Sequence, residues 1–442
     1  MQNSLTSGNV FKNIVRFSLP YLLSYFMQTL YGMADLYIVG QFDGVDSITA
    51  VSVGSQVMHM VTVMIVGLAM GATVTIGQAI GAGKKDTASD LVGNTITMFM
   101  CGSVAVAAVL ILCVNRIVPV MSTPAEAVAG TKIYLTICFA GIPFITAYNI
   151  ISSIFRGMGD SKSPMYFIGI ACVSNILLDY IFIGVMGLGS AGAALGTTIS
   201  QTISVAVSAI IILKRKTGLV LKRSSFRIQR DPSSRILKIG LPVALQDGFI
   251  QISFLIITII ANRRGLNDAA AVGIVEKIIG MLFLVPSSML SAVSALAAQN
   301  IGAGKPDRAV KTLRYAITIC VSFGALAVFT IQLLAKPVIS LFADSPEVVL
   351  LGSQYIRGYI FDCIFAGIHF CFSGYFCACA KSGISFLHNV LSIILVRIPG
   401  AYLTSILFPD TLLPMGIAVA LGSVLSSVIC VIFYWRMRRE IS

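Results

Sequence analysis

Charged side chains are the scarcest feature of this 442-residue sequence, since Asp, Glu, Lys and Arg together make up only 11% of it. A soluble domain usually carries about 25% charged residues. Hydrophobic residues make up 57%, so a soluble protein of this composition would have too little polar surface to cover its exterior. Apolar runs such as 51–83 exceed the roughly 20 residues that cross a bilayer as a helix. The composition therefore excludes a soluble domain and indicates an all-α integral membrane protein.

Histidine is also scarce, and the sequence lacks the residue groupings that an enzyme needs. The three histidines, His59, His369 and His388, each stand alone in apolar sequence. A membrane-embedded enzyme requires a convergent nucleophile and base or a cluster of metal ligands, and no Ser/His/Asp grouping or His-x-x-x-His occurs. The ten cysteines lie almost entirely in apolar runs, where small thiols usually serve packing. We expect no enzymatic activity, no cofactor and no metal other than a transported ion, and an embedded enzyme is the least favoured class.

A short Gly-rich, charged segment occurs twice in the chain. GQAIGAGKKDTA occupies residues 77–88 and AQNIGAGKPDRA occupies residues 298–309, with most positions identical. Lys84 and Lys305 resemble the lysine of a phosphate-binding loop, but Lys and Pro follow them where that loop needs Ser or Thr. We instead predict a tight cytoplasmic turn in which glycine permits positive φ and Asp86 caps the next helix.

The apolar segments fall into two sets of six, and the repeated turn follows the second segment of each set. Because each set is even in number, both sets should insert in the same orientation, as parallel repeats. We predict twelve transmembrane helices in two six-helix lobes, residues 1–214 and 235–442, joined by a basic cytoplasmic linker at 215–234. The predicted helices are 13–40, 47–78, 92–120, 131–155, 163–185, 188–214, 235–262, 268–299, 310–337, 350–376, 384–408 and 413–436.

The basic residues indicate how the chain is oriented. The polar start of the chain, residues 1–17, lacks the features of a cleavable leader, so we expect the first helix to remain as a span. Most of the 31 Lys and Arg residues fall in segments on the same side as the N-terminus, above all in the linker. Lys and Arg stay on the cytoplasmic side, so we predict that both termini are cytoplasmic. The net charge of +13 then follows from topology, and we expect no nucleic-acid partner.

Several motifs resemble those of the multidrug and toxic compound extrusion (MATE) transporters. They are the two repeated turns, MADLYIVGQFDG at the end of the first predicted helix, FRGMGDSKSP after the fourth and SNILLDYIFI in the fifth. The resemblance covers essentially the whole chain and points to bacterial members, in the MepA-like branch of Gram-positive bacteria. It implies a cation-coupled antiporter of the cytoplasmic membrane, with a central cleft that opens alternately inward and outward. We expect a monomer in the lipid bilayer that expels small, amphipathic, cationic molecules.

Two acidic residues lie inside the predicted helices of the first lobe. An acid within a span costs about 2.5–3.5 kcal/mol on insertion scales, so each one is a functional candidate. Asp35 and Asp179 fall at similar depth in helices one and five. Asn175 shares the helical face of Asp179, and Gln28 and Tyr31 share the face of Asp35. This spacing predicts an acidic pocket that takes up a proton or ligates Na⁺, and the resemblance implies that Asp35 and Asp179, with Asn175 as partner, couple ion to drug.

The second lobe does not repeat these acids. Its predicted helices instead contain Asp247, Glu276, Asp362 and Arg397. Asp362 and Arg397 both fall near the middle of a span, so we predict that they form an ion pair. Glu276 is a candidate for contact with substrate or ion. Some MATE branches use an acid in helix seven, where Asp247 is the only one, but its position departs from the family pattern and leaves a second-lobe sodium site open.

A second interpretation stays within the same superfamily, as a flippase of lipid-linked saccharides. Such chains usually have fourteen spans and a cavity rich in Arg or Lys that holds a pyrophosphate. This chain has twelve predicted spans and mainly acids in its first lobe, which favours cationic cargo. The sequence leaves open whether H⁺ or Na⁺ is the coupling ion.

Overall fold

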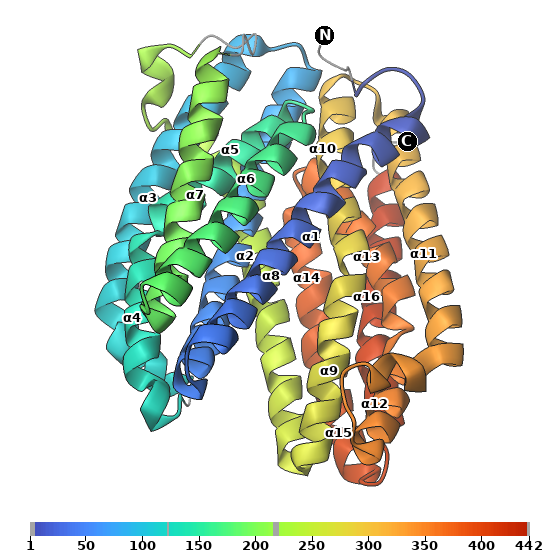
Figure 1. Ribbon diagram of the computed structural model, residues 1–442. Coiled ribbons are helices and arrows are strands. Elements are labelled where there is room, and N and C mark those ends of the chain that lie inside the picture. The colour runs from blue at the N-terminus through green and yellow to red at the C-terminus, as the bar shows by residue number, and fades with distance from the viewer. Residues whose placement is uncertain (1–4, 122, 215–220, 440–442) are drawn as a thin grey trace. The chain divides into compact units, whose positions relative to one another are not determined.

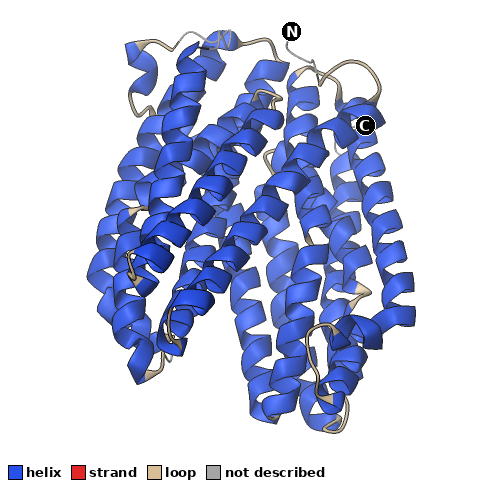
Figure 2. Cartoon of the chain, in the orientation of Figure 1, coloured by secondary structure: helices blue, strands red, loops and turns tan. Residues whose placement is uncertain are grey.

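The structure is a computed structural model that describes residues 5–121, 123–214 and 221–439. Within these ranges every regular element is a helix and no strand occurs (Figure 2). An apolar chain favours helices because a helix pairs its own backbone N–H and C=O groups, and lipid offers these groups no hydrogen-bond partners. The all-α fold predicted from composition is confirmed.

The helices are arranged in two sets along the chain (Figure 1). The first set is α1 Val10–Phe42, α2 Val45–Gly81, α3 Lys85–Val120, α4 Val128–Ala140 with α5 Ile142–Gly157, α6 Lys162–Asp179 with the π-helical η2 Tyr180–Val185, and α7 Gly189–Lys214. The second set is α8 Arg230–Arg264, α9 Leu266–Leu282 with α10 Leu284–Gly302, α11 Pro306–Ser340, α12 Pro346–Tyr359 with α13 Asp362–Ala378, α14 Ser382–Ser392 with the π-helical η4 Ile393–Arg397 and α15 Ile398–Leu407, and α16 Leu413–Arg439. Two short 3₁₀ turns, η1 Ala125–Ala127 and η3 Arg223–Phe226, lie between them.

The described helices match the predicted number of spans. Nine are long and apolar enough to cross a membrane, and the number rises to eleven if each of two bent pairs counts as one span. α1 has 33 residues but is not among them, since its tyrosines, Gln28 and Asp35 lower its mean hydropathy. Adding α1 to the eleven makes twelve segments in the described chain, six in each half, as the sequence predicted.

The fourth segment of each half is bent. The angle is 48° between α4 and α5 and 41° between α12 and α13. Pro143 follows the first break and cannot donate a backbone hydrogen bond to the preceding turn. The second break, at residues 360–361, places Asp362 in the first turn of α13. The sequence predicted uninterrupted helices at 131–155 and 350–376, so it missed both breaks.

The repeated Gly-rich segment forms the same turn twice. Gly83 and Gly304 have φ of +71° and +68°, a region that glycine adopts without a Cβ clash. The amide of the lysine that follows donates to the preceding helix at 3.0 Å in the first turn and 2.8 Å in the second. The predicted cap by Asp86 is wrong, because α3 begins at Lys85 and Asp86 already lies inside its first turn.

The described chain separates into two compact units, each with its own apolar core. The first unit runs from Leu19 to Gly240, and the second runs from Leu241 onward and includes the described residues before Leu19. The division falls inside α1 and α8 and not at the predicted linker 215–234, of which residues 215–220 lie outside the described residues. The core residues include Val51, Leu135, Phe139 and Ile142 in the first unit and Val275, Ile331, Tyr355 and Val419 in the second.

Polar contacts explain why the division falls there. The segment before α8 is held within the first unit, where Ser225 Oγ donates to Asp90 Oδ1 at 2.7 Å. The segment before α1 is held within the second unit by the Arg308 guanidinium, which donates to Ser7 O at 3.1 Å and to Gly8 O at 3.0 Å. The residues just before α8 therefore belong to the first unit, and the described residues just before α1 belong to the second unit.

Candidate functional site

The first unit buries two acids close to each other. Asp35 lies on α1 and is 3% exposed, and Asp179 is the last residue of α6 and is 0% exposed. The side chains of Asp179, Asn175 and Thr197 all lie close enough to Asp35 to interact with its carboxylate. Thr197 on α7 donates to Asp35 Oδ2 at 3.3 Å. The structure thus brings together the three residues that the sequence singled out as coupling candidates, and it adds a hydroxyl from α7 that was not predicted.

Helix α7 approaches the end of α6 so closely that one position must lack a side chain. A Cβ on Gly196 would overlap Asp179 Oδ1. One turn earlier, a Cβ on Gly192 would lie 3.1 Å from the backbone carbon of Phe182 in η2. π-helical turns within α-helices are frequent at functional sites, and η2 begins directly after Asp179. The small residues at the start of α7 are a sequence signal for this close approach.

The acid oxygens of this pocket have no basic partner in the part of the chain that the structure describes. Among the described residues no ion pair involves Asp35 or Asp179. Asp35 Oδ1, both oxygens of Asp179 and both amide atoms of Asn175 have no hydrogen-bond partner there either. Two ionised carboxylates only accept hydrogen bonds and repel each other, so neither satisfies the other. A proton shared between them, or a monovalent cation bound by their oxygens, removes the repulsion, and the pair is suited to either ion.

Two tyrosine side chains lie near Asp35. Tyr31, which the helical face predicted, and Tyr134 on α4 both lie close enough to Asp35 to interact with its charge. The Tyr134 hydroxyl forms a hydrogen bond of 3.1 Å with Ser55 Oγ. Its ring lies against Gly54, where a Cβ would overlap it. Gln28 is half-buried and forms no hydrogen bond with the described residues, so the structure does not join it to the pocket.

The second unit buries an acid that does have a basic partner. Asp362 Oδ2 and Arg397 Nη1 are 3.8 Å apart, which is the ion pair that the sequence predicted. Arg397 Nη2 also donates to the Tyr359 hydroxyl at 2.7 Å. The guanidinium lies over the ring of Phe254, 4.9 Å from its centroid. The pair therefore combines a loose ionic contact with one good hydrogen bond and one cation–π contact.

The other two acids of the second unit differ in their relation to Arg397. Glu276 on α9 accepts a hydrogen bond from Thr258 at 3.2 Å and lies close enough to Arg397 to interact with its charge. Asp247 on α8 is half-buried and forms neither a hydrogen bond nor an ion pair with the described residues. Asp247 lies close enough to Cys377 to interact with it electrostatically. The structure thus joins Glu276, but not Asp247, to the Arg397 group.

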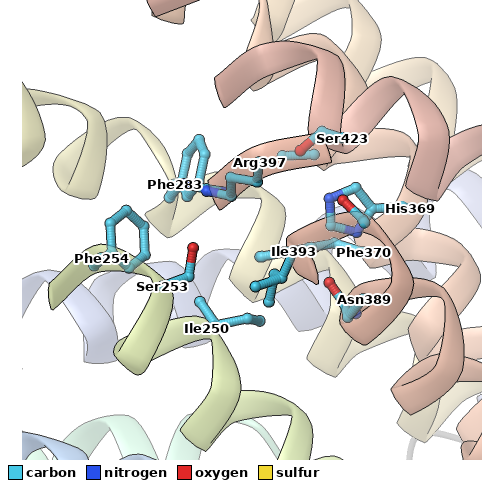
Figure 3. Close-up of a pocket in the computed structure, with 12 residues that line it drawn as sticks. Ile250, Ser253, Phe254, Phe283, His369, Phe370, Asn389, Ile393, Arg397 and Ser423 are labelled. Atoms are coloured by element: carbon cyan, nitrogen blue, oxygen red, sulfur yellow. The ribbon is translucent and has the colours of Figure 1, made fainter. Parts of the chain in front are cut away.

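A cavity of about 40 Å³ lies beside Arg397 within the second unit (Figure 3). Three of its lining atoms, Ser253 Oγ, His369 Nδ1 and Arg397 Nε, have no hydrogen-bond partner among the described residues. His369 is not solitary, as the sequence suggested, because its ring centroid lies 5.6 Å from that of His388. His388 forms hydrogen bonds of 2.9 Å and 2.6 Å with two serine hydroxyls. Residues that are isolated in sequence form a polar group here because α13 and α14 pack together.

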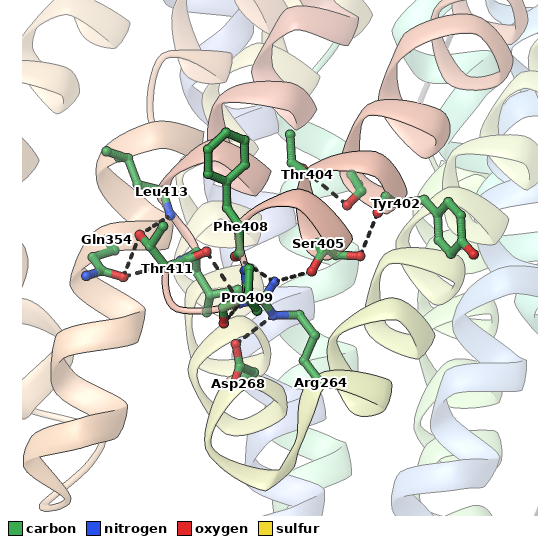
Figure 4. A network of polar contacts seen from close by, with 12 residues as sticks. Arg264, Asp268, Gln354, Tyr402, Thr404, Ser405, Phe408, Pro409, Thr411 and Leu413 are labelled. Carbon is green, nitrogen blue, oxygen red and sulfur yellow. Dashed lines mark hydrogen bonds and ion pairs between the residues drawn. The ribbon is translucent and has the colours of Figure 1, made fainter.

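A second arginine of this unit, Arg264, forms several hydrogen bonds with neighbouring residues (Figure 4). Its Nε donates to Asp268 at 2.8 Å, and its amino groups donate at 2.7 Å to Ser405 O and to Pro409 O. Two longer contacts reach further carbonyls of the same loop. The Arg264 guanidinium therefore donates to α9, to the last turns of α15 and to the loop that follows α15, whereas Arg397 keeps an Nε that has no partner among the described residues.

Comparisons with known proteins agree with this architecture. Residues 20–181 and 242–403, one stretch in each half, match the MatE protein family. The probable multidrug resistance protein YpnP of Bacillus subtilis is 29% identical over 439 residues, which cover 98% of this chain and 96% of that protein. The multidrug export protein MepA of Staphylococcus aureus is 24% identical over 83% of this chain and 81% of that protein. The repeat inferred from the two turns is confirmed by the double family match.

Solved structures show the same fold. One, described as the outward-facing conformation of a multidrug resistance MATE family transporter of the MOP superfamily, superposes with a TM-score of 0.92. The two chains are 24% identical, and the match covers 100% of this chain and 98% of the other. At this identity the likeness establishes the arrangement of helices, and the roles of individual residues rest on the geometry described above.

Proposed function

This chain belongs to the MatE family, and from that premise we propose that it is a cation-coupled antiporter that exports amphipathic, cationic compounds from bacterial cells. It acts as a monomer in the lipid bilayer of the cytoplasmic membrane, with both termini in the cytoplasm, and uses H⁺ or Na⁺ as the coupling ion. The names of the relatives, a probable multidrug resistance protein and a multidrug export protein, support the export of drugs. We assign the chain no enzymatic reaction, no cofactor and no nucleic-acid partner.

The observation that carries the proposal is the buried acid pair without a basic partner. Asp35 and Asp179 lie together, and no Lys or Arg among the described residues pairs with them. A carboxylate attracts a cation far more strongly in a poorly hydrated site than in water. The pair is therefore suited to bind a cation, and Asn175 adds an amide with two unpartnered atoms beside it.

The mechanism follows from competition for this charge. When a proton or Na⁺ neutralises the pair, the pocket loses its attraction for a cationic compound, so binding of the ion and of the drug is negatively coupled. The Thr197 hydroxyl holds one oxygen of Asp35 in place. The rings of Tyr31 and Tyr134 provide faces on which an organic cation can lie. Alternating exposure of this pocket to the two sides of the membrane then exchanges an incoming ion for an outgoing drug.

The flippase interpretation fits the second unit less well. A pyrophosphate group calls for free positive charge. Arg397 already faces Asp362 at 3.8 Å and also interacts with Glu276. Its charge is thus offset within the protein, which disfavours an anionic head group as the main cargo.

Transport by everted membrane vesicles tests the proposal. Vesicles that contain the protein, and matched vesicles that lack it, are loaded with ethidium while ΔpH and ΔNa⁺ are imposed separately. We expect dye uptake driven by one of these gradients. An anionic dye serves as the control for charge. Uptake of only the anionic dye, or no gradient-driven uptake with the protein present in the membrane, would overturn the proposal and favour the flippase.

A further inference from the structure

The acids of the two units differ in one respect, the presence of a basic side chain. Asp35 and Asp179 have none among the described residues, whereas Asp362 faces Arg397, and Glu276 also interacts with Arg397. We infer that Arg397 is a built-in cation that occupies a monovalent-cation site formed by Asp362, Glu276 and Tyr359, so that replacing Arg397 with a neutral residue opens this site to Na⁺. The inference goes beyond the proposed function, because it concerns ion binding in the second unit and does not depend on which compound is exported.

Arg397 is held where a bound ion would be held. Asp362 is 0% exposed and Arg397 is 8% exposed, so their charges interact through protein and not through water. The Tyr359 hydroxyl accepts from Nη2 at 2.7 Å. Gly422 on α16 makes room for the arginine, since a Cβ on Gly422 would lie 3.0 Å from Arg397 Cβ. The Arg397 side chain is therefore held by close packing at its Cβ and by one good hydrogen bond from its guanidinium.

The carboxylates around Arg397 retain capacity to bind an ion. Neither Asp362 oxygen accepts a hydrogen bond from the described residues, and Glu276 Oε1 is also unpartnered. Ser423 lies within reach of Asp362. Hard cations prefer carboxylate, hydroxyl and carbonyl oxygens as ligands, and these groups supply them. Without the guanidinium, the buried Asp362 charge would be uncompensated, a situation that costs several kcal/mol unless another cation takes its place.

The cavity beside Arg397 provides space for a water ligand of such an ion: Arg397 and Ser423 line it, whereas Asp362, Glu276 and Tyr359 do not. It measures about 40 Å³ and is bounded by Ser253, Asn389 and Ser423 as well as by aromatic rings (Figure 3). A site of roughly 10–15 Å³ already holds one water molecule. Shortening Arg397 to glutamine would enlarge the cavity further. The space vacated by the guanidinium would then take the Na⁺ ion, and the adjoining cavity would take a water ligand.

The test is the dependence of thermal unfolding on Na⁺, measured on the full-length protein in detergent. NaCl is compared with choline chloride at equal ionic strength. All variants carry Asp35→Asn and Asp179→Asn, so that the first unit does not contribute a Na⁺ response. In this background we expect Arg397→Gln to gain a saturable rise in Tm with Na⁺, of at least about 2 °C.

Three controls isolate the cause of that rise. Arg397→Lys keeps the charge and should show no Na⁺ response. Arg397→Gln combined with Asp362→Asn removes the proposed ligand and should lose the response. Arg264→Gln removes another buried arginine, one that contacts Asp268 and backbone carbonyls, and should lower Tm equally in both salts.

The inference is overturned if the folded Arg397→Gln protein responds to Na⁺ no more than Arg397→Lys does, because Asp362 would then be satisfied by a proton. It is also overturned if the background protein with Arg397 intact is stabilised by Na⁺, a measurement that does not require the glutamine variant to fold. Neither result depends on transport, so failure of the antiporter proposal in vesicles remains distinguishable.

Discussion

Gly196 and Asp179 are fitted to each other: α7 passes the end of α6 at a distance that leaves no room for a Cβ beside Asp179 Oδ1. The next residue on α7 is Thr197, and its Oγ1 lies 3.3 Å from Asp35 Oδ2. The position of the acid pair therefore depends on a glycine that bears no functional group. A residue that bears no functional group thus sets how closely α7 approaches Asp179.

We predict that Gly196→Ala impairs transport although it leaves every polar residue in place. The added methyl group must displace either Asp179 or α7, and overpacking of this kind typically costs about 1–3 kcal/mol. Ethidium efflux should fall strongly and Tm should decrease. Gly102→Ala is the matched control, because no atom lies within 4 Å of the new Cβ. Equal efflux by Gly196→Ala and Gly102→Ala would show that the close approach does not matter for function.

Neutralising the acids should separate function from stability. Asp35→Asn and Asp179→Asn keep size and hydrogen-bonding capacity but remove the charge, and each removes a desolvation cost of about 2.5–3.5 kcal/mol on insertion scales. We expect efflux at the level of membranes without the protein, together with an unchanged or higher Tm. Glu276→Gln, measured beside them, should retain more activity because Glu276 lies near Arg397. Wild-type efflux and ion dependence in Asp35→Asn would end its assignment as a coupling acid.

The sequence predicted mainly the features that are determined within one helix, and one pair of residues between two helices. Helical spacing placed Asn175 on the face of Asp179 and Tyr31 on the face of Asp35, and both neighbours are found in the pocket. It also predicted the span count and the two turns, because apolar length and a repeated Gly-rich segment are local features. Asp362 and Arg397 were paired from their similar depth in two helices, and they do form an ion pair.

The sequence could not predict which other helices complete the pocket. Tyr134 and Thr197 reach Asp35 because α4 and α7 pack closely against their neighbours at Gly54 and Gly196, and nothing in helical spacing specifies such a tertiary contact. The bends at Gly141 and before Asp362 were missed for a related reason. A membrane-length apolar run looks continuous whether or not packing bends it, and only Pro143 gave a local signal.

Topology yields a prediction that is independent of transport. The excess of Lys and Arg in the segments on the N-terminal side predicts that Lys84 and the η3 turn face the cytoplasm. In a protein depleted of its ten cysteines, Lys84→Cys and Ser224→Cys should resist an impermeant maleimide in intact cells and react after permeabilisation. Asp410→Cys, in the loop before α16, should react in intact cells. Labelling of Ser224→Cys from outside would reverse the orientation.

The Thr197 hydroxyl offers the finest test of the acid pocket. Thr197→Val keeps the shape of the side chain but removes the donor to Asp35 Oδ2. A hydrogen bond to a charged group contributes about 1.5–3 kcal/mol, so the concentration of coupling ion at half-maximal efflux should change by roughly 10- to 150-fold. The maximal rate at saturating ion should change less, because both carboxylates remain. Thr202→Val is the control on the same helix, since Thr202 donates to the carbonyl of Thr198 and not to an acid. If both variants shift the ion dependence equally, the effect belongs to α7 as a helix, and Thr197 does not position Asp35.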